Sequence, residues 1–288
     1  MIVLRTPGLA IVLLLFSGFH VANGQGSVRR ETPVEVEAEE LPSAYGAPPD
    51  LSRGRISTLT KSYVLSPFSF ELETGYEGDL FRHGLPAHLF TQEIEMGLPA
   101  RFTVGAHNLV ERFDDNTRDA QFTLEGRYAL ANWNRLPFNP AVSAEYHFGI
   151  GHGAEDSGEL ALLMSHSFSH LVEWALNVFV EHGFGGAQST EGGFAQSVEI
   201  PVLLPEEKLE AGIEMQYHTG DTASLHRSRK GFTIGPTLAW RPTKAARFDV
   251  SPLIGCSHDA PAVQIFAIFS LSFGSGPETE IPASARGR

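Results

Sequence analysis

Residues 67–274 repeatedly alternate apolar with polar side chains, and this pattern most narrows the folds that the chain can adopt. The run EAGIEMQY at positions 210–217 is one example. Successive side chains of a strand point to opposite faces, so the pattern predicts strands with one apolar and one polar face. About twelve such segments occur, each with the roughly 9–11 residues that a tilted strand needs to cross a bilayer. The sequence therefore predicts an all-β fold, an antiparallel transmembrane β-barrel of about 12 strands.

The first 24 residues have the pattern of a secretion signal peptide. Arg5 gives a positive start, Leu9 to Phe16 form an apolar core, and Ala22-Asn23-Gly24 fits a cleavage site. A membrane anchor is the alternative, but this apolar core is shorter than the about 20 residues that span a bilayer. We therefore expect residues 1–24 to be removed on export.

Three further regions follow from composition. Residues 25–66 are acidic and rich in proline, a composition that buries little, so we predict a disordered linker there. Residues 67–274 form the predicted outer-membrane barrel, and residues 275–288 form a C-terminal tail.

Connector lengths favour a membrane barrel over a soluble β-sandwich, which would also have alternating strands. The expected links alternate between short ones, such as 98–100 and 242–245, and longer ones, such as 112–118 and 220–230. Short periplasmic turns and longer outer loops are typical of outer-membrane barrels. Residues 131–139 are the exception, with a medium-length link on the short side.

The tryptophans add to this prediction. Trp133, Trp174 and Trp240 all fall at the strand ends that the connectors place on the periplasmic side. Aromatic side chains form belts where a barrel meets the lipid head groups, so we expect these three in such a belt. The alternative is that aromatic residues simply favour strands.

The polar faces of the strands carry many carboxylates and few cations. Charges at this density need water or partners, because burying an unpaired charge costs several kcal/mol. In a barrel they would line the lumen; in a soluble sandwich they could face outward. The residues predicted to face the lumen are Glu71, Glu73, Glu93, Glu95, Glu125, Arg127, Glu145, Glu199, Glu210, Glu214 and Arg241.

Several of these features together resemble a family of bacterial outer-membrane channel-like proteins named for the meta-pathway of phenol degradation. The resemblance lies in the signal, the Pro-rich lead-in and aromatic-rich hairpins such as Phe68 to Tyr76 and Ile234 to Trp240. It covers about residues 60–274. It implies an outer-membrane barrel with a transport role and assigns no site residues.

The sequence contains only weak patterns of catalytic or metal-binding residues. We therefore predict no catalytic, cofactor-binding or metal site and no cofactor. Ser165 and His166 are next to each other, so they fall on opposite faces of a strand, unlike a nucleophile and its base. Glu145 and His147 share a face, but no third metal ligand is predictable from the sequence. The net charge of −13 excludes nucleic acid as a partner.

The leading hypothesis is that the protein lets small solutes pass across the bacterial outer membrane. Its expected partners are the lipids of the outer membrane and, if the lumen is open, the small solutes. A structural or adhesion barrel with a filled lumen is the alternative. An outer-membrane lipid-modifying enzyme is the third. A barrel of about twelve strands lies in size between small barrels with filled lumens and wide porins. Its size therefore does not indicate whether the lumen is open or plugged.

Overall fold

A computed structural model describes residues 44–48, 51, 54–83, 85–113, 116–150, 155–169, 172–185, 190–202, 208–220, 230–243 and 245–274. The predicted signal peptide, most of the linker and the C-terminal tail lie outside these residues. Among the residues described, no helix is long and apolar enough to cross a membrane.

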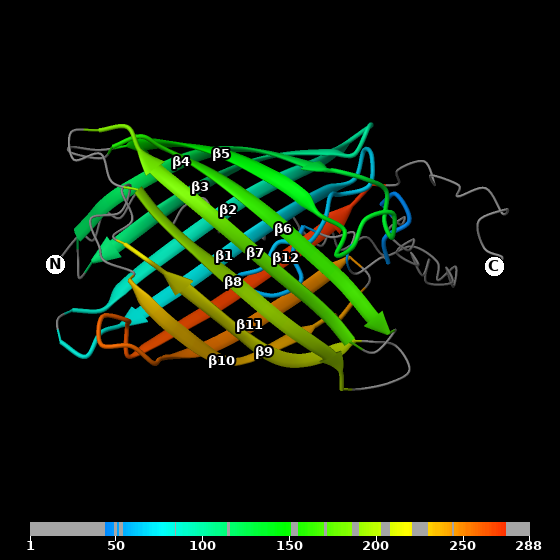
Figure 1. Cartoon of the computed structure of the whole chain (residues 1–288). Coiled ribbons are helices and arrows are strands. Elements are labelled where there is room, and N and C mark those ends of the chain that lie inside the picture. The colour runs from blue at the N-terminus through cyan, green and yellow to red at the C-terminus, as the bar shows by residue number, and fades with distance from the viewer. Residues whose placement is uncertain are drawn as a thin grey trace, which may run out of the picture. The chain divides into compact units, whose positions relative to one another are not determined.

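Twelve antiparallel strands close into one barrel, which confirms the predicted fold class (Figure 1). Each strand pairs with its neighbours in sequence, and β1 closes the ring by pairing with β12, where Phe70 lies opposite Phe273. The strands are β1 (Phe70–Leu80), β2 (Ala87–Leu98), β3 (Phe102–Phe113), β4 (Asn116–Ala129), β5 (Ala141–Ile150), β6 (Ser157–Ser169), β7 (Val172–Gly183), β8 (Thr190–Pro201), β9 (Leu209–His218), β10 (Gly231–Trp240), β11 (Ala246–Gly255) and β12 (Val263–Phe273).

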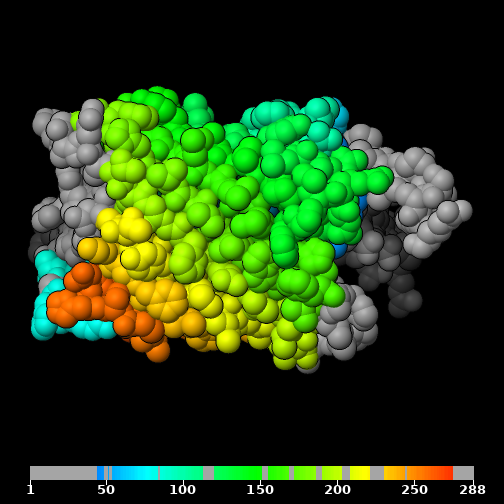
Figure 2. All heavy atoms as spheres, viewed as in Figure 1, coloured from blue at the N-terminus to red at the C-terminus, as the bar shows by residue number. Residues whose placement is uncertain are grey.

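The outer face of the barrel is apolar along every strand. Figure 2 shows one side of this wall, where side chains of neighbouring strands lie against each other from the green to the orange part of the chain. Every strand contributes at least one exposed apolar side chain: Leu72, Ile94, Val104, Leu124, Val142, Leu160, Val178, Val198, Ile213, Leu238, Ile254 and Phe269. A wall of this kind suits contact with lipid, and it would be costly in water.

The prediction of a disordered linker over residues 25–66 is wrong for its C-terminal part. Residues 54–66, which we call the luminal loop, lie inside the barrel, and Ile56, Tyr63 and Val64 in it are fully buried. The loop doubles back on itself, because Ile56 N donates to Thr60 O at 2.9 Å and Ser62 N to Gly54 O at 3.3 Å. Composition missed this loop because its order comes from the surrounding wall, and its own residues bury little against each other.

The luminal loop joins the wall beside Gly97 on β2. Phe68 N donates to Gly97 O at 2.7 Å, and Gly97 N donates to Ser69 O at 2.9 Å. A Cβ atom at position 97 would lie 1.9 Å from the carbonyl oxygen of Ser66. Only glycine lets the chain pass this close to the strand.

One predicted loop is much shorter than expected. The sequence suggested a connector over 112–118, but β3 runs to Phe113 and β4 begins at Asn116, with these two residues paired. The polar residues of this region continue the strands, with a register shift at Glu111 and Arg112. Polarity alone therefore misplaced the end of the hairpin.

Candidate functional site in the lumen

The inner face of the barrel carries a row of glutamates that pair across neighbouring strands. In the registers of β4 to β8, each strand contributes one member directly opposite the next: Glu125, Glu145, Glu159, Glu181 and Glu191. On the other side of β3, Glu95 pairs with Glu71. Like charges directly opposite each other are unfavourable, so this row needs cations or water.

The structure places the residues predicted to face the lumen on the inner face. All are buried except Glu145, which is partly exposed to the lumen. They fall into two groups: those on β1 to β5, and those on β8 and β9 together with Arg241, which directly follows β10. The luminal loop lies between these groups and contacts both.

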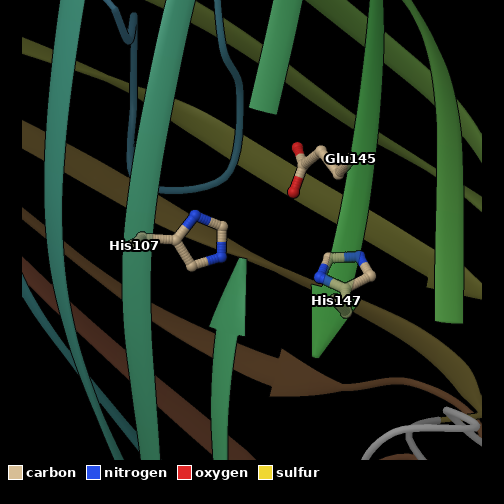
Figure 3. A group of neighbouring side chains, drawn as sticks. All are labelled: His107, Glu145 and His147. Carbon is tan, nitrogen blue, oxygen red and sulfur yellow. The ribbon is translucent and has the colours of Figure 1, made fainter. Parts of the chain in front are cut away.

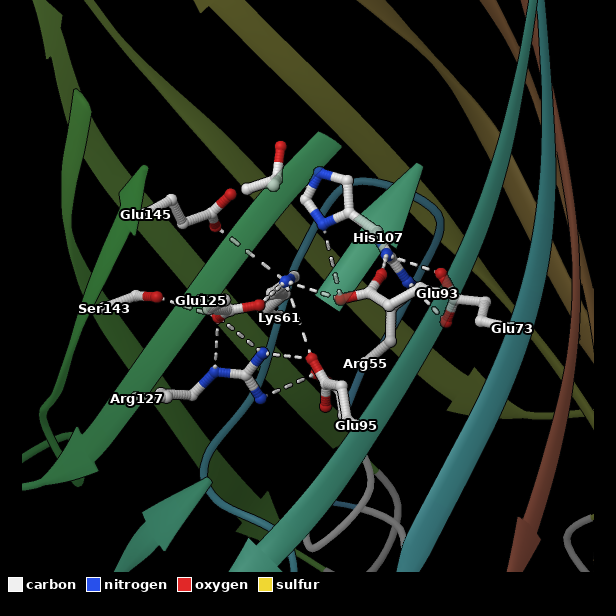
Figure 4. A network of polar contacts seen from close by, with 12 residues as sticks. Arg55, Lys61, Glu73, Glu93, Glu95, His107, Glu125, Arg127, Ser143 and Glu145 are labelled. Carbon is white, nitrogen blue, oxygen red and sulfur yellow. Dashed lines mark hydrogen bonds and ion pairs between the residues drawn. The ribbon is translucent and has the colours of Figure 1, made fainter. Parts of the chain in front are cut away.

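Two cations of the luminal loop occupy the first acidic group (Figure 4). Arg55 Nη2 lies 2.6 Å from Glu73 Oε1 and 3.5 Å from Glu93 Oε2. Lys61 Nζ contacts Glu125 and lies 3.1 Å from Glu93 and 3.5 Å from Glu95. These charge-assisted contacts offset the repulsion among the carboxylates.

Arg127 on β4 completes this network from the wall. Its Nη2 atom donates to Glu95 at 2.7 Å and to Glu125 at 2.9 Å. Its Nη1 atom reaches the carbonyl oxygens of Gly54 and Tyr63 at 3.4 and 3.3 Å. Arg127 therefore holds two strand carboxylates and both ends of the luminal loop together.

The tip of the luminal loop contacts the second group of strands, β8 and β9, in the barrel wall. Glu214 on β9 accepts hydrogen bonds from Ser57, from Thr58 Oγ1 at 2.5 Å and from Leu59 N at 2.7 Å. Thr60 Oγ1 lies 2.8 Å from Ser57 Oγ and 2.7 Å from Ser197 Oγ on β8.

A fourth cation, Arg247, holds the loop from β11. Arg247 donates to the carbonyl oxygen of Ile56 and lies 2.7 Å from Asp249 Oδ1 and 3.4 Å from Glu199 Oε2. The loop thus bridges strands on both sides of the lumen.

A buried apolar cluster joins the luminal loop to the connector between β4 and β5. Tyr63 packs edge-on against Trp133, with ring centroids 5.2 Å apart, and its hydroxyl donates to Ala131 O. Trp133 N donates to the carbonyl oxygen of Tyr45 at 3.1 Å. The connector between β4 and β5 therefore packs against the chain segment before β1.

This arrangement corrects the prediction for Trp133. Its side chain is buried in the apolar cluster and takes no part in a belt facing lipid. Trp240 is 51% exposed on the outer face, and Trp174 is partly buried beside Phe138, with ring centroids 5.5 Å apart. The sequence could not distinguish the three tryptophans, because all of them were expected at strand ends. Only Trp133 lies in a connector that folds inward.

A cavity of about 240 Å³ remains beside the luminal loop. The acidic row forms much of its wall, with Glu145, Glu159, Glu181 and Glu191, and His218 and Gln216 face it from β9. Arg55, Leu59 and Lys61 form its boundary on the side of the loop. The cavity is therefore lined by four carboxylates and two cations, together with apolar side chains such as Leu163 and Phe179.

The residues considered for hydrolase chemistry lie apart. Ser165 is fully buried on the inner face, whereas the ring of His166 packs 4.9 Å from the ring of Phe168. A nucleophile and its base must lie within hydrogen-bonding reach of each other. This pair therefore does not form a catalytic site.

Sequence reasoning missed the residues that fill the lumen. Arg55 and Lys61 lay in the region expected to be disordered, and Arg247 was not among the residues predicted to face the lumen. One signal was present: the segment with Arg55 and Lys61 comes before a strand whose polar face is acidic. Charge complementarity between a lead-in segment and the following barrel could have indicated this contact.

The closed sheet, its apolar outer face and its charged lumen together define the class of the protein. It is a transmembrane antiparallel β-barrel with twelve strands among the described residues. No protein-family model and no curated protein matches the sequence. Among solved structures, the chain is similar to an outer-membrane channel from Pseudomonas putida F1, with a TM-score of 0.50 and 10% identity over 73% of this chain and 97% of that one.

Two porins are also similar. The KdgM porin has a TM-score of 0.49 and 11% identity, covering 71% of this chain and 99% of the porin. The NanC porin has a TM-score of 0.48 and 7% identity, covering 71% and 99%. At these identities the similarity concerns the fold. The resemblance to the phenol-degradation family stays a prediction.

Proposed function

We propose that the protein lets small hydrophilic solutes, mainly cations, pass across the bacterial outer membrane, and that the luminal loop limits this passage. The outer face would contact membrane lipids. The observation that carries the proposal is the cavity lined by four glutamates beside the luminal loop.

The chemistry of the loop's contacts supports a displaceable loop. Arg55, Lys61 and the hydroxyls of Ser57 and Thr58 bind carboxylates, groups that water solvates well. When such a pair separates into water, hydration of both partners offsets much of the lost attraction. The net free energy that holds the loop is therefore smaller than its many contacts suggest.

A structural barrel with a permanently filled lumen is the second candidate. The apolar cluster favours it, because Tyr63 of the luminal loop packs on Trp133 through groups that water does not solvate well. The two functions differ in one property: in a structural barrel, the luminal loop never leaves.

Solute flux into liposomes tests the proposal. Liposomes containing the purified protein should admit small cationic and neutral solutes faster than empty liposomes, and an Arg55→Gln/Lys61→Gln variant should admit them faster still. An Arg135→Gln variant serves as the control, because Arg135 is exposed in the β4–β5 connector. Flux equal to that of empty liposomes for both proteins would favour the structural barrel.

The cellular location has its own test. Fractionation of cells should recover the protein in the outer membrane, and the folded barrel should migrate differently on gels before and after heating. Recovery as a soluble periplasmic protein would contradict the proposal.

A further inference from the structure

Two histidines and a glutamate meet in the lumen beside the luminal loop. His107 lies on β3, and Glu145 and His147 lie on β5. One potential ligand atom from each lies within 4.8 Å of the others. Figure 3 shows the three side chains directed into a common space.

The strand register brings these residues together. His107 pairs with Thr123 on β4, and Thr123 pairs with His147 on β5, so the two histidines flank one threonine on the inner face. Glu145 is two residues before His147 and shares its face. The group therefore sits on three hydrogen-bonded strands, a rigid base for a binding site.

We propose that His107, Glu145 and His147 bind a divalent transition-metal cation of the Zn²⁺ type. Two imidazole nitrogens and one carboxylate oxygen are the donors that Zn²⁺ takes in sites with three protein ligands. Mg²⁺ and Ca²⁺ prefer sites made of oxygen atoms alone. The donor set thus selects a class of cation.

Hydrogen bonds around the histidines fit this role. His147 Nδ1 lies 2.8 Å from Thr123 Oγ1, and if it donates there, Nε2 keeps the lone pair that binds a metal. Metal-binding histidines usually have their second nitrogen held in this way. His107 Nδ1 is buried and has no hydrogen-bond partner among the residues that the structure describes. A ligand at His107 would thus add a favourable contact to a side chain that has few.

The nearby charges leave room for a cation. Glu93 Oε1 lies 4.0 Å from His107 Nδ1, and Lys61 Nζ lies 3.9 Å from Glu145 Oε1. Lys61 is much closer to Glu125 and Glu93 than to Glu145, so a metal at Glu145 leaves its main contacts in place. A second cluster of three carboxylates in the lumen already contacts Lys61 and Arg127. It consists of Glu93, Glu95 and Glu125.

The proposed site opens to the cavity. Glu145 belongs to both, so the proposed site lies at the edge of the space lined by Glu159 and Glu181. A bound metal would place a positive charge at the edge of this acidic cavity. The inference does not depend on whether solutes pass through the barrel.

Calorimetric titration of the full chain with ZnCl₂ in detergent tests the site. We expect one Zn²⁺ ion per chain, and binding weakened at least about tenfold in His107→Gln and in His147→Gln. Co²⁺ in place of Zn²⁺ should give the visible spectrum of nitrogen and oxygen ligands, and the spectrum should change in both variants. Heat-modifiable gel migration shows that each variant has folded.

His182→Gln is the matched control. His182 Nδ1 lies 2.7 Å from Thr190 Oγ1, the same kind of contact as in His147, but its side chain is exposed and outside the group. This variant should bind Zn²⁺ as the unchanged protein does. Equal affinity in the folded His107→Gln and His147→Gln variants, or no Zn²⁺ binding by the unchanged protein, would overturn the proposal.

Discussion

The guanidinium group of Arg55 donates hydrogen bonds to both carboxylate oxygens of Glu73, from Nη2 at 2.6 Å and from Nε at 3.1 Å. This two-point contact joins the luminal loop to β1, the first strand that follows it. Bidentate pairs of arginine and carboxylate fix geometry as well as charge, so this contact sets where the loop lies in the lumen.

Replacing Arg55 by glutamine should destabilise the protein. Glu73 would stay buried without the cation that it pairs with, and breaking such a pair costs about 3–5 kcal/mol. Urea unfolding in detergent micelles should show this loss, and Arg55→Gln/Glu73→Gln should recover part of it. Arg135→Gln should leave the free energy of unfolding unchanged, and an Arg55→Gln variant as stable as this control would refute the role of Arg55.

Gly97→Ala should loosen the junction between the loop and the wall. The added Cβ atom would meet the Ser66 carbonyl oxygen at 1.9 Å, which forces the backbone to move. Overpacking of this kind costs about 1–3 kcal/mol in the free energy of unfolding. Gly126→Ala is the matched control on β4, because its Cβ would meet no atom within 4 Å. Equal stabilities for the two variants would contradict the packing seen at Gly97.

Tryptophan fluorescence should separate the belt from the apolar cluster. In variants that keep one tryptophan each, brominated lipids should quench Trp240 strongly and Trp133 weakly, because Trp240 lies on the outer face and Trp133 packs on Tyr63. Strong quenching of Trp133 would restore the original prediction that it faces lipid.

The difference between these two tryptophans shows what the sequence can and cannot predict. Alternation is a local property, so it predicted twelve strands and the inner face that carries Glu125 and Glu214. The position of Trp133 depends on Tyr63, which is 70 residues away in sequence, and local patterns carry no information on such contacts. The order of the luminal loop is missed for the same reason, since Arg55 and Lys61 are held by strands that follow later in the chain.

The histidine group shows the same limit. Glu145 and His147 share a face by sequence spacing, but His107 joins them only through the register of β3, β4 and β5. Strand register depends on turns and on pairing across the barrel. A third ligand was therefore unpredictable until the strands were placed.

Current through the lumen should favour cations. Carboxylates of the acidic row line the cavity, and fixed charges that line a pore attract ions of opposite sign. Reversal potentials in a KCl gradient should show this preference in dilute salt, and the preference should fade in concentrated salt as screening shortens to about 3 Å at 1 M.

Variants of the cavity provide the comparison. Glu159→Gln/Glu181→Gln should reduce the cation preference, whereas Asp259→Asn, at an exposed position in the β11–β12 connector, should not. A preference for anions in the unchanged protein would mean that these carboxylates do not set the potential along the path.

Single-channel recording in planar bilayers tests the central claim most directly, that the luminal loop limits passage through the barrel. The account predicts rare, small openings for the unchanged protein. It predicts larger and longer openings for the Arg55→Gln/Lys61→Gln variant, since each substitution removes a cation that holds the loop to the wall. Silence from both proteins, with each shown to be folded by heat-modifiable migration, would contradict this account.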